Sequence, residues 1–505
     1  MRANRPVREF EERRTPMSPA SIALNRFGYG LARGGSAPRD PKTWLLLQIE
    51  AFDPAPPAIA ARAETRGRSA EMLETLRSFR DRVREMGEPA MAEGAMPGAM
   101  AETGGDNPRA AALAGLPPEY RAKVLEARRV AIDDLATSVN VAVASETPLI
   151  ERLVHFWSNH FSVSLGKPGT QFEVGPHQFT AIRPHVLGKF SDLLKAAVLH
   201  PAMLLYLDQF QSIGPEAPIQ RLRARRANAQ QRPRGLNENL AREIMELHTF
   251  GVHGGYAQAD VTEFARALTG WTVPGIGRIG RFAVDQPSGA AFVAPAHEPG
   301  DRTIMGKRYA EGGAEQAIGI LDELAAHPAT ARFIAIKFAR HFAGDTPPET
   351  LVARLEADFR RTGGDLASLT TTLVNSPEAW APGPVKFRSP FEWFIAALRL
   401  SGVNSLSPQR IAAALNELGQ APWRAPSPAG YDDLAASWAA PDVIWRRAEL
   451  AERMAQGAPS DDVLARATAA FPDALSDTTR TMLTRAESGR QALALLLVAP
   501  EMMRR

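Results

Sequence analysis

All ten histidines of this 505-residue chain lie between His155 and His341, in the middle part of the sequence. Imidazole binds metal ions and transfers protons near neutral pH, so any histidine chemistry must be assembled from this part of the chain. Two short polar motifs stand out within it, VHFWSNHF at residues 154–161 and LNENLAREIMELH at residues 236–248. Each has the spacing of a single helix.

The first motif places His155 and Asn159 one helical turn apart, on a face that also carries Glu151. His160 follows His155 by five residues, and at 100° per residue this turns it about 140° away. An undistorted helix therefore does not let one small ion bind both imidazoles. The two histidines are not interpreted as a chelating pair.

In the second motif, helical spacing predicts a polar face beside an apolar one. The two faces consist of Asn239, Arg242, Glu243 and Glu246, and of Leu240, Ile244 and Leu247. One interpretation is a salt-bridged surface helix, since Glu238–Arg242 and Arg242–Glu246 are both i,i+4 pairs. The other is a buried polar network, because ion pairing alone does not account for Asn237, Asn239 and Glu243 on the same turns.

A divalent metal ion is one cofactor that such a network could hold. Glu243 and Glu246 are three residues apart and can offer oxygens together. Imidazole ligands would have to come from several elements, and the candidates are His160, His248 and His297. The Glu-x-x-His spacing of metal sites in helical bundles is absent, because Glu246 and His248 are only two residues apart. Acid–base catalysis by the same groups without a metal is the alternative.

Composition excludes several classes of protein. The chain has no cysteine, which rules out disulfides, thiolate ligands and a cysteine nucleophile. It also lacks a P-loop, a His-Glu-x-x-His helix and a Gly-x-Ser-x-Gly elbow, and no Gly-x-Gly-x-x-Gly follows a predicted strand. The formal charge is only +3, so nucleic acid is not an expected partner.

The sequence also bears on the compartment. No segment approaches the roughly 18–20 apolar residues that cross a bilayer, so no membrane span is expected. A twin arginine at Arg13 and Arg14 is followed by an apolar stretch that Asn25 and Arg26 interrupt. We therefore expect no signal peptide and a cytoplasmic protein, with the periplasm as the alternative.

Periodicity predicts a mainly α fold, one large multi-helix domain over residues 18–505 with a small β-hairpin insertion at 273–309. Residues 1–17 are expected to be disordered, and residues 87–117, rich in Ala, Gly, Met and Pro, to form a mobile loop. Residues 212–235, with six arginines between 221 and 234, are expected to form an exposed, solvated loop. Lys337 and His341, four residues apart on a predicted helix, are interpreted as structural, and His327 as flanking or capping the start of that helix.

Several motifs recur in order: LNRFGYG, FWSNHFSVS, LHPAMLLYLD, the block from LNENLAREIMELH to LTGWTV, HEPGDRTIMG, HPATARFIAIKFARHF and KFRSPFEW. Together they resemble the bacterial "domain of unknown function 1800" family over about residues 22–447. The resemblance implies a mainly helical protein, brings no established activity, and departs at Ser158, where members often have histidine. His155 stands where an aromatic residue is common, which favours His160 as the functional histidine.

The resemblance also implies a context, because many members look exported. Their genes often accompany a second uncharacterised family that resembles the alkaline phosphatase and sulfatase group. A co-encoded protein of that group is therefore the expected partner.

Two hypotheses follow. In the first, the protein is an enzyme, metal-dependent or acid–base, whose buried site between helices draws on Asn159, His160, Asn239, Arg242, Glu243, Glu246, His248 and His297. In the second, it is a non-catalytic helical scaffold or partner of the co-encoded exported protein, and the same residues form a satisfied network that fixes helix packing.

Overall fold

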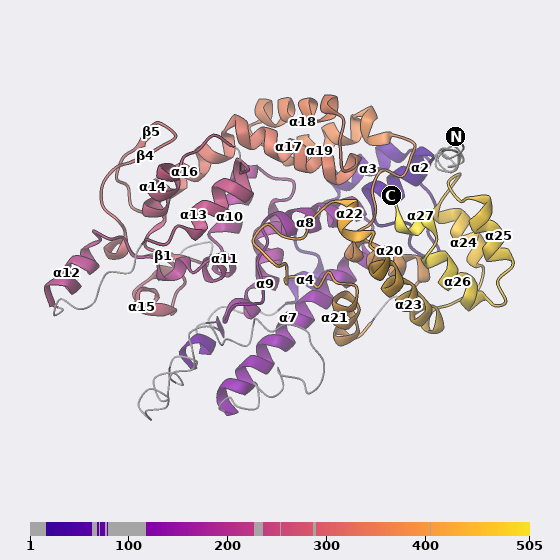
Figure 1. The fold of residues 1–505 in the computed structure, drawn as a ribbon, viewed down its shortest axis with the longest axis horizontal. Coiled ribbons are helices and arrows are strands. Elements are labelled where there is room, and N and C mark those ends of the chain that lie inside the picture. Colours follow the sequence, from indigo (N-terminus) through magenta and orange to yellow (C-terminus); the bar gives the residue numbers. More distant parts are fainter. Residues whose placement is uncertain are drawn as a thin grey trace, which may run out of the picture.

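A computed structural model describes residues 17–62, 118–226, 236–252, 254–285, 289–403 and 406–505, together with residues 68, 69, 71–75 and 78. The N-terminus expected to be disordered lies outside these ranges except for Met17, as does the whole loop expected to be mobile at 87–117. The described residues are mainly helical, with two small antiparallel sheets, which confirms the predicted fold class (Figure 1).

The N-terminal part builds the middle of the molecule from helices that often begin at a proline. Proline suits the first helical turn, because that position needs no intrahelical N–H donor and proline already has a helical φ. The elements are α2 (Pro19–Ile22), the π-helix η1 (Ala23–Phe27), α3 (Pro41–Glu50), α4 (Pro57–Ala60), α7 (Pro118–Ala144) and α8 (Pro148–His160).

The middle part contains short helices that pack around α8 and extend to one end of the molecule. They are η2 (Thr170–Phe172), α9 (Val174–Pro176), η3 (His177–Ile182), η4 (Arg183–His185), α10 (Phe190–Val198), α11 (Pro201–Tyr206), η5 (Gln209–Gln211), α12 (Pro218–Arg226), α13 (Asn239–Glu243), η6 (Ile244–Thr249) and α14 (Gln258–Leu268). The prediction of a loop over residues 212–235 was wrong for residues 218–226, which form α12. Its cause is local: Pro218 supplies an N-terminal turn, and arginine is a good helix former.

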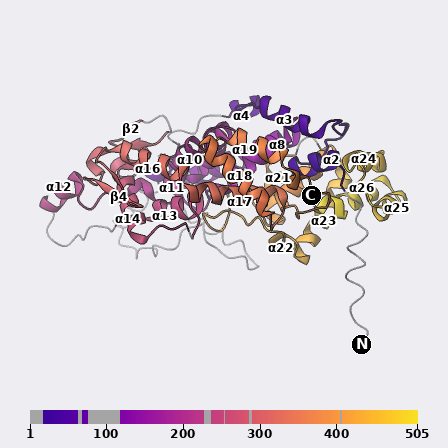
Figure 2. The same cartoon turned by 90° about the horizontal axis from the view of Figure 1, so that it is seen from above.

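The predicted β insertion is present, although its strands are very short. β1 (Trp271–Thr272), β2 (Val284–Asp285) and β3 (Ala291–Phe292) form a sheet of order β1-β3-β2, with α15 (Gly277–Gly280) between β1 and β2 and η7 (Ala294–Ala296) after β3. β4 (Arg302–Ile304) and β5 (Lys307–Tyr309) form a separate hairpin. Its turn contains Gly306 at φ +76°, a conformation that glycine adopts without steric cost. The strands lie with α12 at the end of the molecule opposite α24–α26 (Figures 1 and 2).

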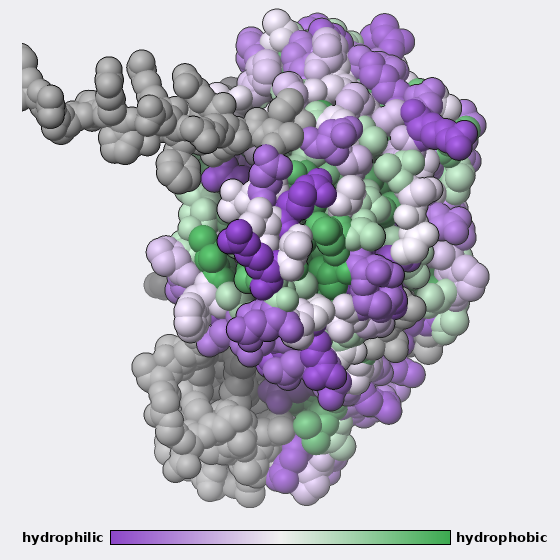
Figure 3. All heavy atoms as spheres, turned by 90° about the vertical axis from the view of Figure 1, so that its right-hand side faces the viewer, coloured by the Kyte–Doolittle hydropathy of each residue, from purple (hydrophilic) through white to green (hydrophobic). Residues whose placement is uncertain are grey.

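The last part is again helical. It comprises α16 (Ala314–Ala326), α17 (Pro328–Ala343), α18 (Glu349–Thr362), α19 (Leu366–Asn375), η8 (Pro377–Trp380), α20 (Pro390–Ser401), α21 (Pro408–Glu417), α22 (Ala435–Trp438), α23 (Pro441–Gly457), α24 (Val463–Ala470), α25 (Asp477–Thr484), α26 (Gly489–Leu497) and α27 (Pro500–Met503). His327 caps α17 as expected, because its Nδ1 accepts the Ala329 N–H at 3.1 Å. On the face formed by the C-terminal helices, hydrophilic side chains interrupt the hydrophobic ones (Figure 3).

Two hydrophobic cores lie side by side. The first draws on α8, α10, α14 and α16–α19, and the second on α7, α20, α21 and α23–α26. Met17, Trp44 and Trp423 are partly buried and pack against both cores. The chain between α21 and α22, residues 418–434, contains Trp423 and crosses the junction of the two cores. We call it the 418–434 loop.

Candidate functional site

A cavity of about 310 Å³ lies between α8, α17, the start of α20 and the 418–434 loop. Its lining is polar for a space enclosed mainly by helices, and it includes two of the residues predicted from the sequence, Asn159 and His160. The other lining residues are His155, Phe156, Lys337, Arg340, His341, Ser389, Glu392, Gln420, Ala429, Gly430, Tyr431, Asp432 and Asp433.

Lys337 and His160 are in contact at the edge of this cavity. His160 is the last residue of α8, and its ring is buried among aromatic side chains. Its Nε2 donates to the backbone carbonyl of His248 at 3.1 Å, a bond that puts the proton on Nε2. Nδ1 is then free to accept from Lys337 Nζ, which lies 2.9 Å away. The His248 backbone thus orients His160, and His160 orients the lysine amine.

Burial changes the protonation of both groups. It lowers the pKa of the Lys337 amine to about 8, and nearby Arg340 acts in the same direction. Burial, together with the adjacent Lys337, holds the pKa of His160 well below its usual range. His160 is therefore a neutral imidazole at pH 7, whereas Lys337 changes charge close to neutral pH.

The cavity lining contains two cations, Lys337 and Arg340, and three carboxylates, Glu392, Asp432 and Asp433. No carboxylate pairs with Lys337 or Arg340 within ion-pair distance among the described residues, although both side chains line the cavity. The neighbouring carboxylates have other partners: Asp433 is 3.2 Å from both His341 Nδ1 and Lys386 Nζ. These contacts outweigh burial and lower the pKa of Asp433 to about 2. Neither of these two cations of α17 is therefore held in a direct ion pair by a described residue.

Glu392 is held by a buried network on one wall. Its carboxylate accepts from Arg152 and, at 2.9 Å, from Arg505, and all three side chains are almost fully buried. Although burial alone would raise it, these arginines hold the pKa of Glu392 well below its usual range. Arg152 also donates to the Gly28 carbonyl at 2.7 Å and lies over the Tyr29 ring. The Glu392 charge is therefore compensated by two buried arginines.

Asn159 fixes the 418–434 loop over the cavity. Its side-chain Nδ2 donates to the Tyr431 carbonyl and its Oδ1 accepts the Tyr431 N–H, both at 2.8 Å. Gly430 has φ +81°, and a Cβ there would stand 2.4 Å from the Asn159 carbonyl oxygen. The close approach of loop and helix thus requires glycine at 430. Asn159 contributes to the site by positioning this loop.

The polar residues of the second motif lie apart from this cavity. Arg242 contacts Glu238 at 3.1 Å and Glu246 at 3.3 Å, and the three side chains are about one third exposed (35%, 28% and 27%). Asn239 is exposed, and Glu243 is partly buried, with its pKa raised by burial and by Glu246. For Glu238, Arg242 and Glu246 the structure matches the salt-bridged surface helix rather than the buried network.

The helix that carries this motif also changes type. From Ile244 to Thr249 it is a π-helix, in which hydrogen bonds run from i+5 to i, as from the Phe250 N–H to the Met245 carbonyl at 3.0 Å. The α-helical arithmetic used for the motif therefore stops at Glu243. His248 is fully buried, and its ring lies against those of His160 and Phe161.

The three histidines named as metal ligands are not gathered into one site. The rings of His160 and His248 have centroids 5.9 Å apart, whereas His297 contacts Thr269 and Phe292 beside the β1–β3 sheet. Across the described part of the chain, no group of three or more His, Asp or Glu side chains is arranged to hold a metal ion. Neither ring nitrogen of His248 has a hydrogen-bond partner there.

Four residues of the cavity were not predicted as functional: Lys337, Arg340, Asp433 and Glu392. Lys337 was interpreted as structural because its partner in sequence, His341, is a neighbour on the same helix. Its actual partner His160 is 177 residues away, and Asp433 is 92 residues from His341. The one local signal is the placement of Lys337, Arg340 and His341 on one side of α17.

Comparison with known families agrees with this fold. The family described as "Protein of unknown function (DUF1800)" matches residues 22–504, nearly the whole chain. The chain belongs to the DUF1800 family. The match extends the predicted resemblance beyond residue 447, so the C-terminal helices are part of the DUF1800 region. Searches of curated proteins and of solved structures gave no match for this DUF1800 protein. Among its described helices, none has the length and apolar character needed to cross a membrane.

Proposed function

We propose that this DUF1800 protein is an enzyme in which Lys337 transfers protons to and from a small anionic substrate bound in the 310 Å³ cavity. The observation that carries the proposal is the pairing of a lysine whose pKa is about 8 with a neutral, oriented imidazole. A general acid or base is most efficient when its pKa is near the working pH, and an unperturbed lysine, with a pKa near 10.5, is poor at it.

Each residue has a distinct role in this proposal. Lys337 is the catalytic residue, because its amine lines the cavity and changes charge near pH 8. His160 is a positioning residue, since its Nδ1 directs the amine and its other nitrogen is engaged by the His248 carbonyl. Arg340, one turn from Lys337, supplies a permanent positive charge for the anion.

The acid–base form of the enzyme hypothesis has more support than the metal-dependent form. The metal-dependent form needs His160, His248 and His297 around one ion, and His297 is engaged elsewhere by the Thr269 carbonyl at 2.9 Å. The acid–base form needs only contacts within hydrogen-bonding distance, and these exist between Lys337, His160 and the His248 backbone.

Competitive acetylation with acetic anhydride, read by mass spectrometry of peptides across pH 6–11, tests the proposal without knowledge of the substrate. We expect Lys337 acetylation to rise with a midpoint near pH 8. Lys195 is the control, because its Asp322 and Asp192 partners raise its pKa despite partial burial. Inorganic phosphate should protect Lys337 in the wild type and much less in the Arg340→Gln variant. A Lys337 midpoint as high as that of Lys195, or no protection by phosphate, would remove the basis for the proposal.

A non-catalytic scaffold or partner role is the second candidate, and one observation favours it. Three of the polar side chains predicted as catalytic have structural partners: Arg242 pairs with Glu238 and Glu246, and both polar atoms of the Asn159 amide bond to Tyr431. The co-encoded exported protein remains the proposed partner in this case. The two candidates predict different effects of removing Lys337. In a scaffold Lys337 should stabilise the fold, whereas a buried catalytic cation lowers the stability.

A further inference from the structure

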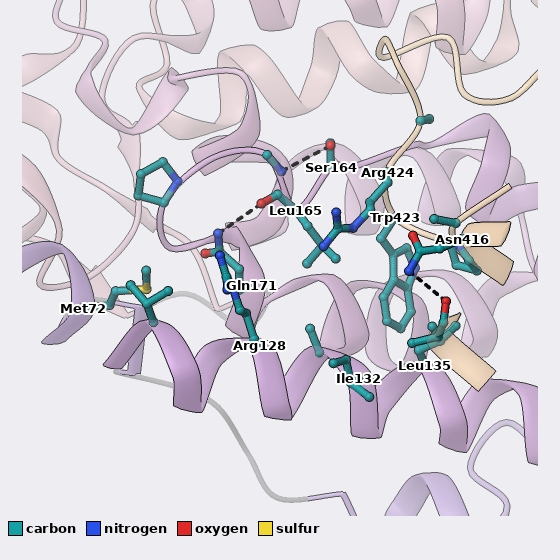
Figure 4. Close-up of a pocket in the computed structure, with 18 of the residues that line it drawn as sticks. Met72, Arg128, Ile132, Leu135, Ser164, Leu165, Gln171, Asn416, Trp423 and Arg424 are labelled. Carbon is teal, nitrogen blue, oxygen red and sulfur yellow. Dashed lines mark hydrogen bonds between the residues drawn. The ribbon is translucent and has the colours of Figure 1, made fainter. Parts of the chain in front are cut away.

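A second and larger cavity, of about 590 Å³, lies beside the Lys337 cavity. Its floor is α7, and its other walls are the chain at residues 164–171, α21 and the 418–434 loop (Figure 4). Trp423 reaches into it from the loop and Arg128 rises from α7 toward Gln171. This volume is large enough for a small organic ligand.

The lining combines apolar walls with positive charge. Ile132, Leu135, Leu165 and the Trp423 ring supply the apolar surface, and Arg128 and Arg424 are the two charged residues. The lining contains no aspartate or glutamate, and within the described part of the chain no ion pair engages Arg128. An arginine beside apolar walls without a carboxylate binds an anion well, because its planar fork donates two parallel hydrogen bonds.

The backbone at Trp423 is strained, which is a second feature of this wall. Trp423 has φ +56°, an uncommon conformation for a bulky residue that costs on the order of 1–3 kcal/mol. Its carbonyl accepts the Leu165 N–H at 2.8 Å, so the strained residue is tied to the opposite wall. Such strain clusters at ligand sites, where surrounding contacts hold the backbone in place.

A third cavity, of about 40 Å³, shares lining residues with both. It shares Leu135, Pro422, Trp423 and Ala425 with the larger cavity. It shares His155, Asn159, Gln420 and Tyr431 with the smaller one. The larger cavity is thus a neighbour of the Lys337 site, with its own charge and its own walls.

We propose that the larger cavity binds an organic anion with an extended apolar body, such as an acyl or aryl carboxylate. The carboxylate is held by Arg128 and the apolar body lies against Ile132, Leu135 and Trp423. This site goes beyond the proposed reaction and does not depend on it, because none of these residues touches Lys337. Burying about ten methylene groups there supplies most of the affinity, and Arg128 supplies the preference for an anion.

Isothermal titration calorimetry of the full chain with decanoate tests this proposal. We expect binding that is weakened at least tenfold in Arg128→Gln and only partly restored in Arg128→Lys, which keeps the charge but lacks the planar fork. Arg129→Gln is the matched control: Arg129 is the next residue on α7, is exposed and lies outside the lining, so its loss should change nothing. Decan-1-ol, with the same chain and no charge, should bind more weakly than decanoate.

The Lys337→Met variant separates this site from the Lys337 cavity, and we expect it to bind decanoate with unchanged affinity. Three results would each overturn the inference: no decanoate binding at millimolar concentration, equal weakening by Arg128→Gln and Arg129→Gln, or loss of binding in Lys337→Met but not in Arg128→Gln. In the last case the anion sits in the smaller cavity. Failure of the Lys337 acetylation experiment would leave the decanoate prediction standing.

Discussion

The Lys337 amine lies 2.9 Å from His160 Nδ1, although the two residues are 177 positions apart in the sequence. The contact joins α17 to the last residue of α8 and lies at the edge of a cavity. Because the lysine donates to a neutral imidazole rather than to a carboxylate, its positive charge is poorly compensated. The poorly compensated charge destabilises the folded state but favours proton transfer. A catalytic and a structural role for Lys337 therefore predict opposite effects of its removal on stability.

Replacing Lys337 by methionine should therefore stabilise the protein. Methionine keeps much of the side-chain volume and removes a buried cation, so we expect the free energy of unfolding to rise by about 1 kcal/mol. Urea unfolding followed by circular dichroism measures the change. Lys195→Met is the control, and it should give no gain because Lys195 loses its ion pair with Asp322. A clear loss of stability in Lys337→Met would instead support the scaffold role.

Substituting Gly430 should disturb the loop that covers the cavity. In Gly430→Ala the new Cβ meets the Asn159 carbonyl at 2.4 Å and the backbone stays at φ +81°, so we expect a loss of about 2 kcal/mol. Gly319→Ala is the control, because Gly319 is inside α16 with open space around it. Alanine there should stabilise by roughly 0.5–1 kcal/mol. Equal melting temperatures for the two variants would mean that Asn159 does not hold the loop.

Glu392→Gln should be among the most damaging single changes in the chain. It leaves Arg152 and Arg505 buried without a counter-charge, and removing one partner of a buried ion pair costs about 3–5 kcal/mol. Chemical denaturation gives the value. Glu378→Gln makes a suitable comparison, because its Arg354 partner is 43% exposed and the expected loss is below about 1 kcal/mol. Similar losses in both variants would show that the Glu392 network is solvated.

Stability should fall with acidification because of buried histidines. Burial lowers the pKa of His248 to about 3 and of His177 to about 4, whereas an exposed histidine titrates near 6.5. Between these values the unfolded chain binds more protons than the folded one, so this contribution is complete above pH 6.5 and is lost as the pH falls toward 4. Each group contributes on the order of 3 kcal/mol.

Melting temperatures measured from pH 7.5 to pH 4.5 test this pH dependence. They should fall most steeply below pH 6.5, and His177→Gln, which has no titrating group at that position, should fall less steeply. An unchanged slope in that variant would assign the acid sensitivity to other groups.

Much of the fold could be predicted from the sequence because its signals are local. Helical periodicity, proline at first turns and the Gly306 turn specify elements over a few residues each, and the His327 cap follows the same rule. Two local predictions failed for physical reasons. α12 forms because arginine favours helix as well as solvent, and the π-helix at residues 244–249 arises from packing that periodicity does not encode.

The candidate site was only partly predictable. Asn159 and His160 were found because they stand in one motif, and both line the cavity. Lys337, Arg340, Glu392 and Asp433 come from three separate parts of the chain, and only the tertiary fold brings them to the end of α8. The second motif attracted attention through its density of charge, yet charge density on a helix mainly reports an exposed face, as Arg242 and its partners demonstrate.

Trp423 packs against both hydrophobic cores, and the larger cavity opens beside it. The lining takes Ala131 from the first core and Leu135 from the second. A ligand in that cavity would therefore contact both hydrophobic cores, and its binding free energy would oppose their separation. Ligand binding would then make the two cores unfold more cooperatively, including residues that do not contact the ligand.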